Sequence, residues 1–441
     1  MSATSTLLNE RIGGKRIKFY RHDSYPKGSN GRYGRSVIFK FGDLIQRAIK
    51  YKEANKSKDV IINMAVYKIQ QDVAIDIDPT SKYYGRVKIH NAHGDGFWSI
   101  DELCKLAGDK GVQVRILYNM DSIKSASETS TSWKKDTTLA GKSHKTCIIR
   151  KVQWNPYNRD QMHNKFLTVN YYSGGSSTMR NTVYVSTSNI DHETYLGNTG
   201  VLINHHDGLY EAYNNYFQII WENASNITSF RKAMTAAHQK TGGLNFDDGT
   251  FSAFFYPTPP IRSDAWDTTY NAVAKAVAGL DKSKKNWIKI NMWHFKKDSF
   301  GARLISEMND LPNASIKVAY SKDSSEKLYD YAVSTKKMIS LHGNNGQRNS
   351  TGNTSGIKLV NYRDHGGSHA KNFMFTTHVG GKWKYWIITG STNIKAGSFK
   401  TKGNNQLMIR SSSRELYDLF GGAFDNYYSY PNSHLVHHSD G

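Results

Sequence analysis

The chain lacks the features that mark several common classes of protein. Its 441 residues include two cysteines, Cys104 and Cys147, too few for a cysteine zinc site or a disulfide scaffold. Cys104 lies in a helical pattern and Cys147 in a strand pattern, so we expect both to be buried free thiols. No apolar run approaches the roughly 18 residues that a membrane-spanning helix requires.

Metal-binding motifs are missing as well. The sequence has no His-Glu-x-x-His, no cysteine pair at ligand spacing and no cluster of carboxylates. The adjacent His437 and His438 belong to the C-terminal tail, where we expect no ligand pair. These absences predict a chemistry that needs neither a metal ion nor another cofactor.

Acidic residues are scarce relative to basic ones. The chain has 37 Asp and Glu against 59 Lys and Arg, which gives a formal net charge of +22. This surplus favours an anionic partner: nucleic acid, an acidic membrane surface or a phosphorylated substrate. Solubility alone is the other explanation. The lysines are spread along the chain, which indicates a broad positive field rather than a basic arm.

The N-terminal segment carries no recognisable targeting signal. Residues 1–18 are polar and contain no apolar signal core. We therefore expect a cytoplasmic protein, or a secreted one if a signal has been removed.

A pattern of secondary structure occurs twice along the chain. Each copy reads strand, helix, strand, loop, a strand preceded by His-x-Lys, a turn with Asn, and a helix. The expected strands and helices are 59–67, 99–107, 112–118 and 209–221 in the first copy, and 287–293, 300–311, 314–320 and 414–427 in the second. An Asn-Met dipeptide at 63–64 and again at 291–292 supports the correspondence. The length suits two fused halves of roughly 200 residues each.

The order of these elements predicts the fold class. Strand, helix, strand indicates parallel pairing, so we expect an α/β protein with mostly parallel mixed sheets flanked by helices. The polar, Gly-rich stretch 240–250 divides the chain into domains 1–245 and 246–441. We expect an irregular lead-in over 1–35 and a loop over 342–356.

The two copies carry the same polar motif at nearly equal spacing. His-x-Lys precedes an apolar strand, and a second strand then ends in a small-residue turn with Asn. The catalytic candidates are the histidine and the lysine of each motif: His163, Lys165, His369 and Lys371. The candidates for binding the oxygens of a substrate are side chains of the two turns: Ser188, Asn189, Ser391 and Asn393.

Two histidines, two lysines and two asparagines suit the hydrolysis of a phosphodiester. Its transition state carries extra negative charge on the phosphoryl oxygens, which preorganised cations and amide donors stabilise. Displacement at phosphorus also needs a nucleophile on one side and an acid on the other. Histidine, with an ordinary pKa of about 6.5, can fill both roles near neutral pH. A neutral histidine can also attack phosphorus and form a covalent intermediate.

The paired motif resembles that of the phospholipase D superfamily, in which His-x-Lys is followed by Asp and then by Gly-Ser-x-Asn. The resemblance covers both motifs and, more loosely, the duplicated layout over most of the chain. It implies two α/β/α halves related by pseudo-twofold symmetry, with one active site between them. It also implies metal-independent phosphoryl transfer through a phosphohistidine, with His163 as the nucleophile and His369 as the acid. The residues that would hold the phosphate oxygens are Lys165, Lys371, Asn189 and Asn393.

The motif departs from the family pattern at three places. Asn170 stands at the Asp position in the first copy, and Thr376 stands there in the second. The Gly-Ser pair of the first turn is Ser186-Thr187.

An acidic residue that often follows the Asn turn and supports a histidine is also missing. Amides or a threonine stand there: Asn198 or Thr199 in the first copy, and Asn404 or Asn405 in the second. An amide oxygen orients an imidazole ring but does not stabilise its cation as a carboxylate does. Asp191 and Glu193 lie close enough in sequence to substitute.

Three functions fit these residues. The first is a monomeric phospholipase D-type phosphodiesterase that hydrolyses phospholipids, or transfers them to alcohols, at an anionic membrane surface. The second is a metal-independent nuclease of the same superfamily, because the positive charge and 12% aromatic residues suit a polynucleotide. The third is a degenerate protein that only binds an anionic ligand. The complete His, Lys and Asn set favours an enzyme, but both substrates are phosphodiesters, so the residues do not separate the first two functions.

Overall fold

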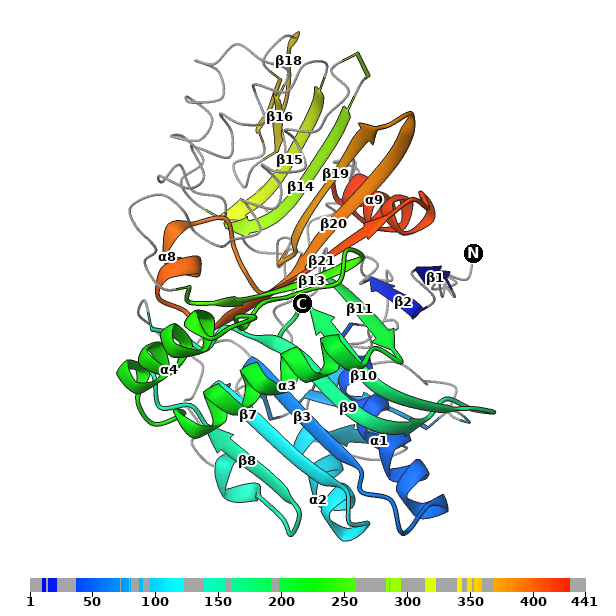
Figure 1. The fold of residues 1–441 in the computed structure, drawn as a ribbon, viewed down its shortest axis with the longest axis vertical. Helices are drawn as coiled ribbons and strands as arrows, with labels where there is room; N and C mark the ends of the chain where they lie inside the picture. Colours follow the sequence, from blue (N-terminus) through cyan, green and yellow to red (C-terminus); the bar gives the residue numbers. More distant parts are fainter. Residues whose placement is uncertain are drawn as a thin grey trace, which may run out of the picture.

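Two large β-sheets with helices packed on them make up the computed structural model of the chain (Figure 1). The structure describes residues 10–12, 15–21, 37–71, 73–78, 80, 87–89, 96–122, 139–155, 160–191, 198–258, 283–284, 286–294, 314–322, 339–342, 347–350, 353–358 and 369–428. The predicted class, α/β with mixed sheets flanked by helices, is confirmed. Among the described helices, none combines the length and the apolar character that crossing a bilayer requires.

The first sheet has eight strands. In order across the sheet they are β1 (Glu10–Ile12), β2 (Lys15–Arg21), β11 (Thr199–Asn204), β10 (Thr178–Ser186), β9 (Lys165–Ser173), β3 (Ile61–Gln70), β7 (Gln113–Ser122) and β8 (Cys147–Lys151). β3, β7 and β8 are parallel, as the strand-helix-strand pattern predicts. The other neighbours are antiparallel. A small separate sheet contains β5 (Val87–Ile89), β4 (Val73–Asp76) and β6 (Phe97–Ser99).

The second sheet has ten strands, and their order matches that of the first sheet from one edge as far as β16. In order they are β12 (Phe246–Asp247), β13 (Phe251–Tyr256), β21 (Asn404–Ser411), β20 (Lys382–Gly390), β19 (Lys371–Val379), β14 (Asn286–His294), β15 (Ala314–Lys322), β16 (Ile339–His342), β17 (Gln347–Ser350) and β18 (Asn353–Lys358). β14, β15 and β16 are again the parallel strands. The pseudo-twofold relation between the halves stays a prediction.

Helices cover both faces of the first sheet. α1 (Phe39–Ala54) and α2 (Ile100–Asp109) pack on one face and α3 (Asp207–Glu222) on the other, followed by α4 (Ile227–Gln239) (Figure 1). Successive residues of β9 point to opposite faces, so Phe166 joins the core under α3 and Leu167 joins the core under α1 and α2. The core under α3 also contains residues of the second sheet and of α9 (Glu415–Tyr428), for example Ile387 and Phe420. The two sheets therefore share one hydrophobic core.

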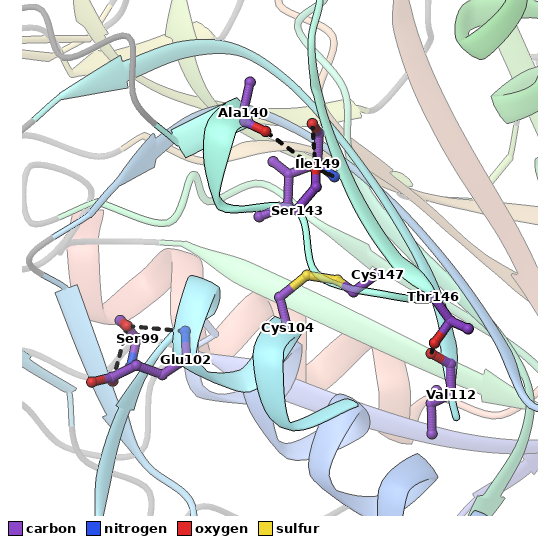
Figure 2. The surroundings of a disulfide bond; sticks show 9 residues. All are labelled: Ser99, Glu102, Cys104, Val112, Ala140, Ser143, Thr146, Cys147 and Ile149. Carbon is purple, nitrogen blue, oxygen red and sulfur yellow. Dashed lines mark hydrogen bonds between the residues drawn. A yellow bond between two sulfur atoms is a disulfide. The ribbon is translucent and has the colours of Figure 1, made fainter. Parts of the chain in front are cut away.

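A disulfide bond joins α2 to the first sheet. α2 begins with a capping box, in which the Glu102 carboxylate accepts from the Ser99 N–H at 2.8 Å and the Ser99 hydroxyl oxygen accepts from the Glu102 N–H at 3.4 Å (Figure 2). One turn further on, Cys104 bonds to Cys147 at the start of β8, with their Cα atoms 5.7 Å apart. The prediction of free thiols is wrong. α2 packs against β7 and β8, and this packing joins residues that lie 43 apart in sequence.

Two segments that we expected to be irregular form strands. The lead-in over 1–35 includes β1 and β2, and the loop over 342–356 includes β17 and most of β18. These strands lie at or next to a sheet edge and pair through the backbone, so they need no alternation of apolar residues. The helix expected over 300–311 lies outside the described residues.

The Asn-Met dipeptides at 63–64 and 291–292 do not occupy corresponding positions of β3 and β14. The correct alignment of the two strands is shifted by two residues. Val66 in β3 pairs with Lys165, whereas Met292 in β14 pairs with Lys371. Met292 therefore corresponds to Val66 and not to Met64. A slip of two residues keeps every side chain on the same face of a strand, so the pattern of the sequence could not reveal it.

Candidate active site

The two His-x-Lys motifs lie at corresponding positions of the two sheets. Lys165 is the first residue of β9 and Lys371 the first residue of β19. The backbone between each histidine and its lysine is held by the neighbouring central strand. The Tyr67 N–H donates to Asn164 O at 2.9 Å, and the Trp293 N–H donates to the carbonyl of residue 370 at 2.9 Å. Each histidine therefore stands just before a central strand, on rigid backbone.

Each histidine ring contacts the turn of the other half. His163 Nδ1 lies 2.9 Å from Ser391 O, and His369 Nδ1 lies 3.0 Å from Thr187 O. A carbonyl oxygen only accepts, so in both rings Nδ1 carries the hydrogen and donates it. In the neutral rings the lone pair then belongs to Nε2. The fold thus brings both predicted histidines into one site built by the two sheets.

The two predicted lysines are buried beside their own histidines. Lys165 Nζ donates to His163 O at 2.9 Å, and Lys371 Nζ donates to His369 O at 2.5 Å. The relative exposure of these lysines is 0% and 1%. In the part of the chain that the structure describes, no carboxylate forms an ion pair with either of them. Burial, followed by the charges of neighbouring lysines, lowers the pKa of both ammonium groups well below 10.5.

The pKa of each histidine is lowered as well, which favours the neutral ring in the absence of substrate. Burial lowers the pKa of His163 well below 6.5, and the positive charges of Lys165 and Lys371 lower it further. Burial and the same two lysines have the same effect on the pKa of His369. Lys371 also contacts the ring of its own histidine: Nζ lies 3.1 Å from Nδ1 and 3.3 Å from Nε2 of His369.

The residues of the two turns support the site in different ways. Ser391 receives the His163 ring on its carbonyl and donates its hydroxyl to Asn404 Oδ1 at 3.1 Å. The Ser188 hydroxyl donates to Asn189 O at 2.8 Å, so this serine stabilises the turn in which it lies. Asn393 Oδ1 accepts from the His294 N–H at 3.1 Å.

Asn189 stands apart from the other turn residues. Its side-chain oxygen is buried and has no hydrogen-bond partner among the described residues. A buried amide in this state is costly unless a ligand or water completes it. Asn189 Oδ1 is therefore left available for a hydrogen-bond donor, such as a water molecule or a hydroxyl of a ligand.

An amide occupies the place of the acidic residue that often supports a histidine. Asn404 Oδ1 lies 3.0 Å from His163 Nδ1, where it accepts from the ring together with Ser391 O. The nearby acid is Asp191, which is buried and forms an ion pair with Lys68 at 3.3 Å. Its negative charge raises the pKa of the two motif lysines, in opposition to their burial. Glu193, the other acid considered, lies outside the described residues.

The two positions that replace the family Asp hold neighbouring strands and do not face the histidines. Asn170 Oδ1 accepts from the Ile61 N–H at 2.7 Å, at the start of β3. Thr376 Oγ1 accepts from the Trp287 N–H at 2.9 Å, at the start of β14. The two contacts correspond to each other in the two halves. Both lie in the second half of their strand, β9 or β19, away from the histidine that precedes the strand. Asn and Thr can supply this acceptor oxygen as well as Asp can.

Two aromatic residues that the sequence did not single out line the site. The Tyr67 ring lies 5.1 Å from the His163 ring, and the Trp293 ring lies 5.4 Å from the His369 ring, centroid to centroid. They stand at corresponding positions of β3 and β14, which the correct register of the two copies would have shown. In the described part of the chain, no group of three or more His, Cys, Asp or Glu could hold a metal ion.

Comparison with known proteins gives one family match. Residues 91–221 match the model described as "Cardiolipin synthase, PLD-like domain". No curated protein sequence matches the chain. This segment contains the first motif, and the second motif repeats its arrangement in the other sheet.

Solved structures resemble the chain at low sequence identity. Polyphosphate kinase from Porphyromonas gingivalis aligns with a TM-score of 0.48 and 11% identity, over 92% of this chain and 50% of that chain, so this chain spans half of that protein's length. Phosphatidylserine synthase from Haemophilus influenzae Rd KW20 aligns with a TM-score of 0.48 and 9% identity, over 93% and 86%. The phospholipase D family member Nuc from Salmonella typhimurium aligns with a TM-score of 0.26 and 12% identity, over 41% and 94%. The PLD-like domain model that matches 91–221, together with the motif present in both halves, supports the resemblance of the chain to the phospholipase D superfamily.

Proposed function

We propose that the protein is a phospholipase D-type phosphodiesterase that hydrolyses phospholipids, or transfers them to alcohols, through a phosphohistidine. The observation that carries this proposal is the pair of histidines, each fixed through Nδ1 by a carbonyl of the opposite half. Each ring can therefore direct Nε2 at a shared phosphate. Lys165 and Lys371 are buried and form no ion pair with a carboxylate in the described part of the chain, so their charges suit the negative charge of that group.

We assign the nucleophile to His163. Ser391 O and Asn404 Oδ1 both accept from its Nδ1, which fixes the neutral tautomer and leaves the lone pair on Nε2. That lone pair attacks phosphorus and forms the P–N bond as the bond to the headgroup oxygen breaks. The Lys371 ammonium lies 3.1 Å from Nδ1 and 3.3 Å from Nε2 of His369, and this adjacent positive charge makes the His369 ring a poorer nucleophile.

His369 is the acid and then the base. Binding of the anionic phosphodiester raises the pKa of the imidazole, because it offsets the positive charges that lower it in the free protein. Protonated His369 gives its proton to the departing alkoxide. The neutral ring then takes a proton from water, or from an acceptor alcohol, which attacks the phosphohistidine and frees His163. The two lysines and the side-chain amide N–H groups of Asn189 and Asn393 bind the non-bridging oxygens during both steps.

The charge and the aromatic rings support a lipid substrate. The net charge of +22 suits an anionic membrane surface. Tyr67 and Trp293 are half-buried at the site, where an amphipathic ring can face both a lipid and its headgroup.

The first prediction concerns products and the covalent intermediate. With phosphatidylcholine vesicles and EDTA present, we expect choline and phosphatidic acid, and phosphatidylethanol when ethanol is added. Rapidly quenched protein should carry a phosphatidyl adduct on His163 by mass spectrometry. His163→Ala should remove the adduct. His369→Ala should lower turnover of phosphatidylcholine by roughly 10²–10⁴-fold and spare an aryl phosphodiester, whose leaving group needs no proton.

Other outcomes would contradict specific parts of the proposal. Cleavage of single-stranded DNA in place of the lipid would identify a nuclease. An adduct on His369 would reverse the two roles. Activity that disappears in EDTA and returns with a divalent ion would exclude a metal-independent reaction. Binding of lipid without any product would identify a degenerate binding protein.

A further inference from the structure

The two motif lysines have different surroundings, although they occupy corresponding positions. Lys371 Nζ lies within hydrogen-bonding distance of both ring nitrogens of His369, at 3.1 and 3.3 Å. Lys165 Nζ donates to His163 O at 2.9 Å and, among the described residues, makes no hydrogen bond to a histidine ring. It lies instead 5.4 Å from the centre of the Tyr67 ring. A cation–π interaction extends to about 6 Å, so this ring and the ammonium group attract each other.

Tyr67 is held in place by its backbone, its hydroxyl and its ring. The backbone N–H donates at 2.9 Å to the carbonyl of Asn164, which lies between His163 and Lys165 in the chain. The hydroxyl accepts from the side-chain amide of Gln161 at 3.4 Å. The ring lies 5.1 Å from the His163 ring and is tilted against it by 49°. One ring therefore contacts both functional side chains of the first motif.

The corresponding residues of the second half are arranged differently. The Trp293 ring lies 5.4 Å from the His369 ring. The Lys371 ammonium contacts the His369 ring itself. In the first half the charge of the lysine thus lies against a tyrosine, whereas in the second half it lies against the histidine. This difference coincides with the proposed division between nucleophile and acid.

Most of the titratable groups around Lys165 oppose its charge. From both halves they are His163, His369, Lys371, Lys402 and Asp191. Asp191 is the acid among them, and its carboxylate forms an ion pair with Lys68 at 3.3 Å. Burial lowers the pKa of Lys165, and the charge of Lys402 lowers it further against the effect of Asp191. The face of an aromatic ring carries partial negative charge, which offsets part of this cost.

Lys402 reaches the site through the backbone that follows it. It lies between the short helix α8 (Ala396–Lys400) and β21, and its Nζ donates to the side-chain oxygen of Gln161. The next residue, Gly403, accepts from the His163 N–H at 2.7 Å. Gln161 thus contacts Lys402 through its oxygen and Tyr67 through its amide. The segment that brings this cation near the motif also fixes the ring that offsets its effect.

We propose that Tyr67 is a positioning residue that holds the Lys165 ammonium on the face of its ring and away from the nucleophilic nitrogen of His163. This inference rests on the proposed function and deepens it, because it assigns the difference between the two histidines to one side chain. Without the ring, Lys165 would lose its proton more readily and could turn to the His163 ring. The charge offered to the phosphate and the lone pair offered for attack would both decline.

The second prediction uses rings at position 67 that keep their shape and change their charge distribution. Tyr67→Phe keeps the negative ring face, and 4-fluoro-, 3,5-difluoro- and 3,4,5-trifluorophenylalanine weaken it stepwise at almost constant size. We expect the pKa of Lys165 to change little in Tyr67→Phe and to fall by roughly one unit over the fluorinated series. Carbon-13 NMR of protein labelled at lysine Cε measures this titration without turnover, and the signal missing from Lys165→Arg identifies the residue.

The pH dependence of kcat/KM for an aryl phosphodiester gives the functional consequence. Lys165 must keep its proton to bind the phosphate oxygens, so activity is lost as the pH rises through its pKa. A fall in that pKa should therefore move the alkaline limb to lower pH, by the same roughly one unit between phenylalanine and trifluorophenylalanine. The matched control compares Trp293→Phe with trifluorophenylalanine at position 293, where fluorination should leave the titration of Lys165 in place.

The NMR titration separates this inference from the proposed function. A pKa of Lys165 that stays constant over the fluorinated series, or that responds equally to fluorination at position 293, would overturn the role of Tyr67 whether or not a lipid is turned over. Fluorination that moves the titration but not the alkaline limb would overturn its part in the reaction. A titration that responds as expected in a protein without phosphodiesterase activity would refute the proposed function alone.

Discussion

At the scale of single residues, the site contains more buried positive charge than it can stabilise alone. Lys165 and Lys371 are buried and form no ion pair with a carboxylate among the described residues, and the lowered pKa of both histidines keeps the rings neutral beside them. Such an arrangement costs stability in the free protein. It is favourable once an anion enters, because the substrate supplies the missing negative charge. The arrangement is therefore consistent with the anionic phosphodiester of the proposed function.

The third prediction concerns the amide that supports His163. Asn404→Asp places a carboxylate 3.0 Å from Nδ1, and this charge stabilises the imidazolium. The pKa of His163 should rise from its lowered value. Because the nucleophile must be neutral, the acidic limb of the kcat/KM profile should move to higher pH. The measurement is a pH–rate profile of both proteins, with an aryl phosphodiester as the substrate.

A neighbouring amide provides the control for this change. Asn405 Oδ1 accepts from the Ser391 hydroxyl at 3.1 Å and has no recorded contact with the ring, so Asn405→Asp adds charge nearby without pairing with His163. It should move the acidic limb less. An acidic limb that stays in place, or moves to lower pH, in Asn404→Asp would show that residue 404 does not act on the nucleophile.

At the scale of elements, the positions of β9 and β19 explain why the motif tolerates substitutions. The start of each strand carries the motif lysine, with the histidine two residues earlier. The middle carries Asn170 or Thr376, which binds the start of the neighbouring strand. The start and the middle of each strand thus have separate roles: the start carries the proposed catalytic lysine, and the middle holds the neighbouring strand. Loss of the family Asp changes a strand contact and leaves the site complete.

The disulfide between α2 and β8 bears on the compartment in which the protein works. It joins α2 to β8, on the side of the first sheet opposite to α3. Disulfides form and persist mainly in oxidising compartments, so this bond favours a secreted protein over a cytoplasmic one.

The fourth prediction tests this bond. Unfolded, unreduced protein should contain no reactive thiol. The double variant Cys104→Ser, Cys147→Ser should lose roughly 2–4 kcal/mol of unfolding free energy, because a 43-residue loop is no longer closed in the unfolded chain. Urea denaturation gives the change, and kcat should remain the same. A reductant should destabilise the wild-type protein and leave the double variant unaffected. Two titratable thiols in the unreduced protein would contradict the bond.

At the scale of the whole molecule, one core and one site serve both sheets. Phe19 of β2 packs on Phe420 of α9 with ring centroids 4.4 Å apart, and Tyr216 of α3 stacks on Phe255 of β13 at 4.6 Å. These contacts cross between the sheets in the same way as the histidine contacts do. The site geometry therefore depends on the shared core.

The fifth prediction separates the halves. Residues 1–245 expressed alone should be inactive, because His163 would lose Ser391 and Asn404 and the second motif would be missing. They should also associate or aggregate, since the core face under α3 would be exposed. Light scattering and the aryl phosphodiester assay measure both properties. A monomeric, fully active half would refute the shared site, and the intact chain run in parallel sets the reference activity.

The sequence by itself determined the class of fold, the duplicated order of strands, and the histidines and lysines of the two motifs. It could do so because strand and helix periodicity are local, and because a motif that recurs at equal spacing is visible without coordinates.

Only the tertiary structure decided which residues meet across the halves. Asn404 on His163, the aromatic rings of Tyr67 and Trp293, and Lys402 beside Gly403 all depend on contacts between segments far apart in the chain. The same holds for the disulfide, and for the register of β14, where a slip of two residues leaves the polar and apolar alternation unchanged. Periodicity records which face of an element is buried, but it does not record what that face is buried against.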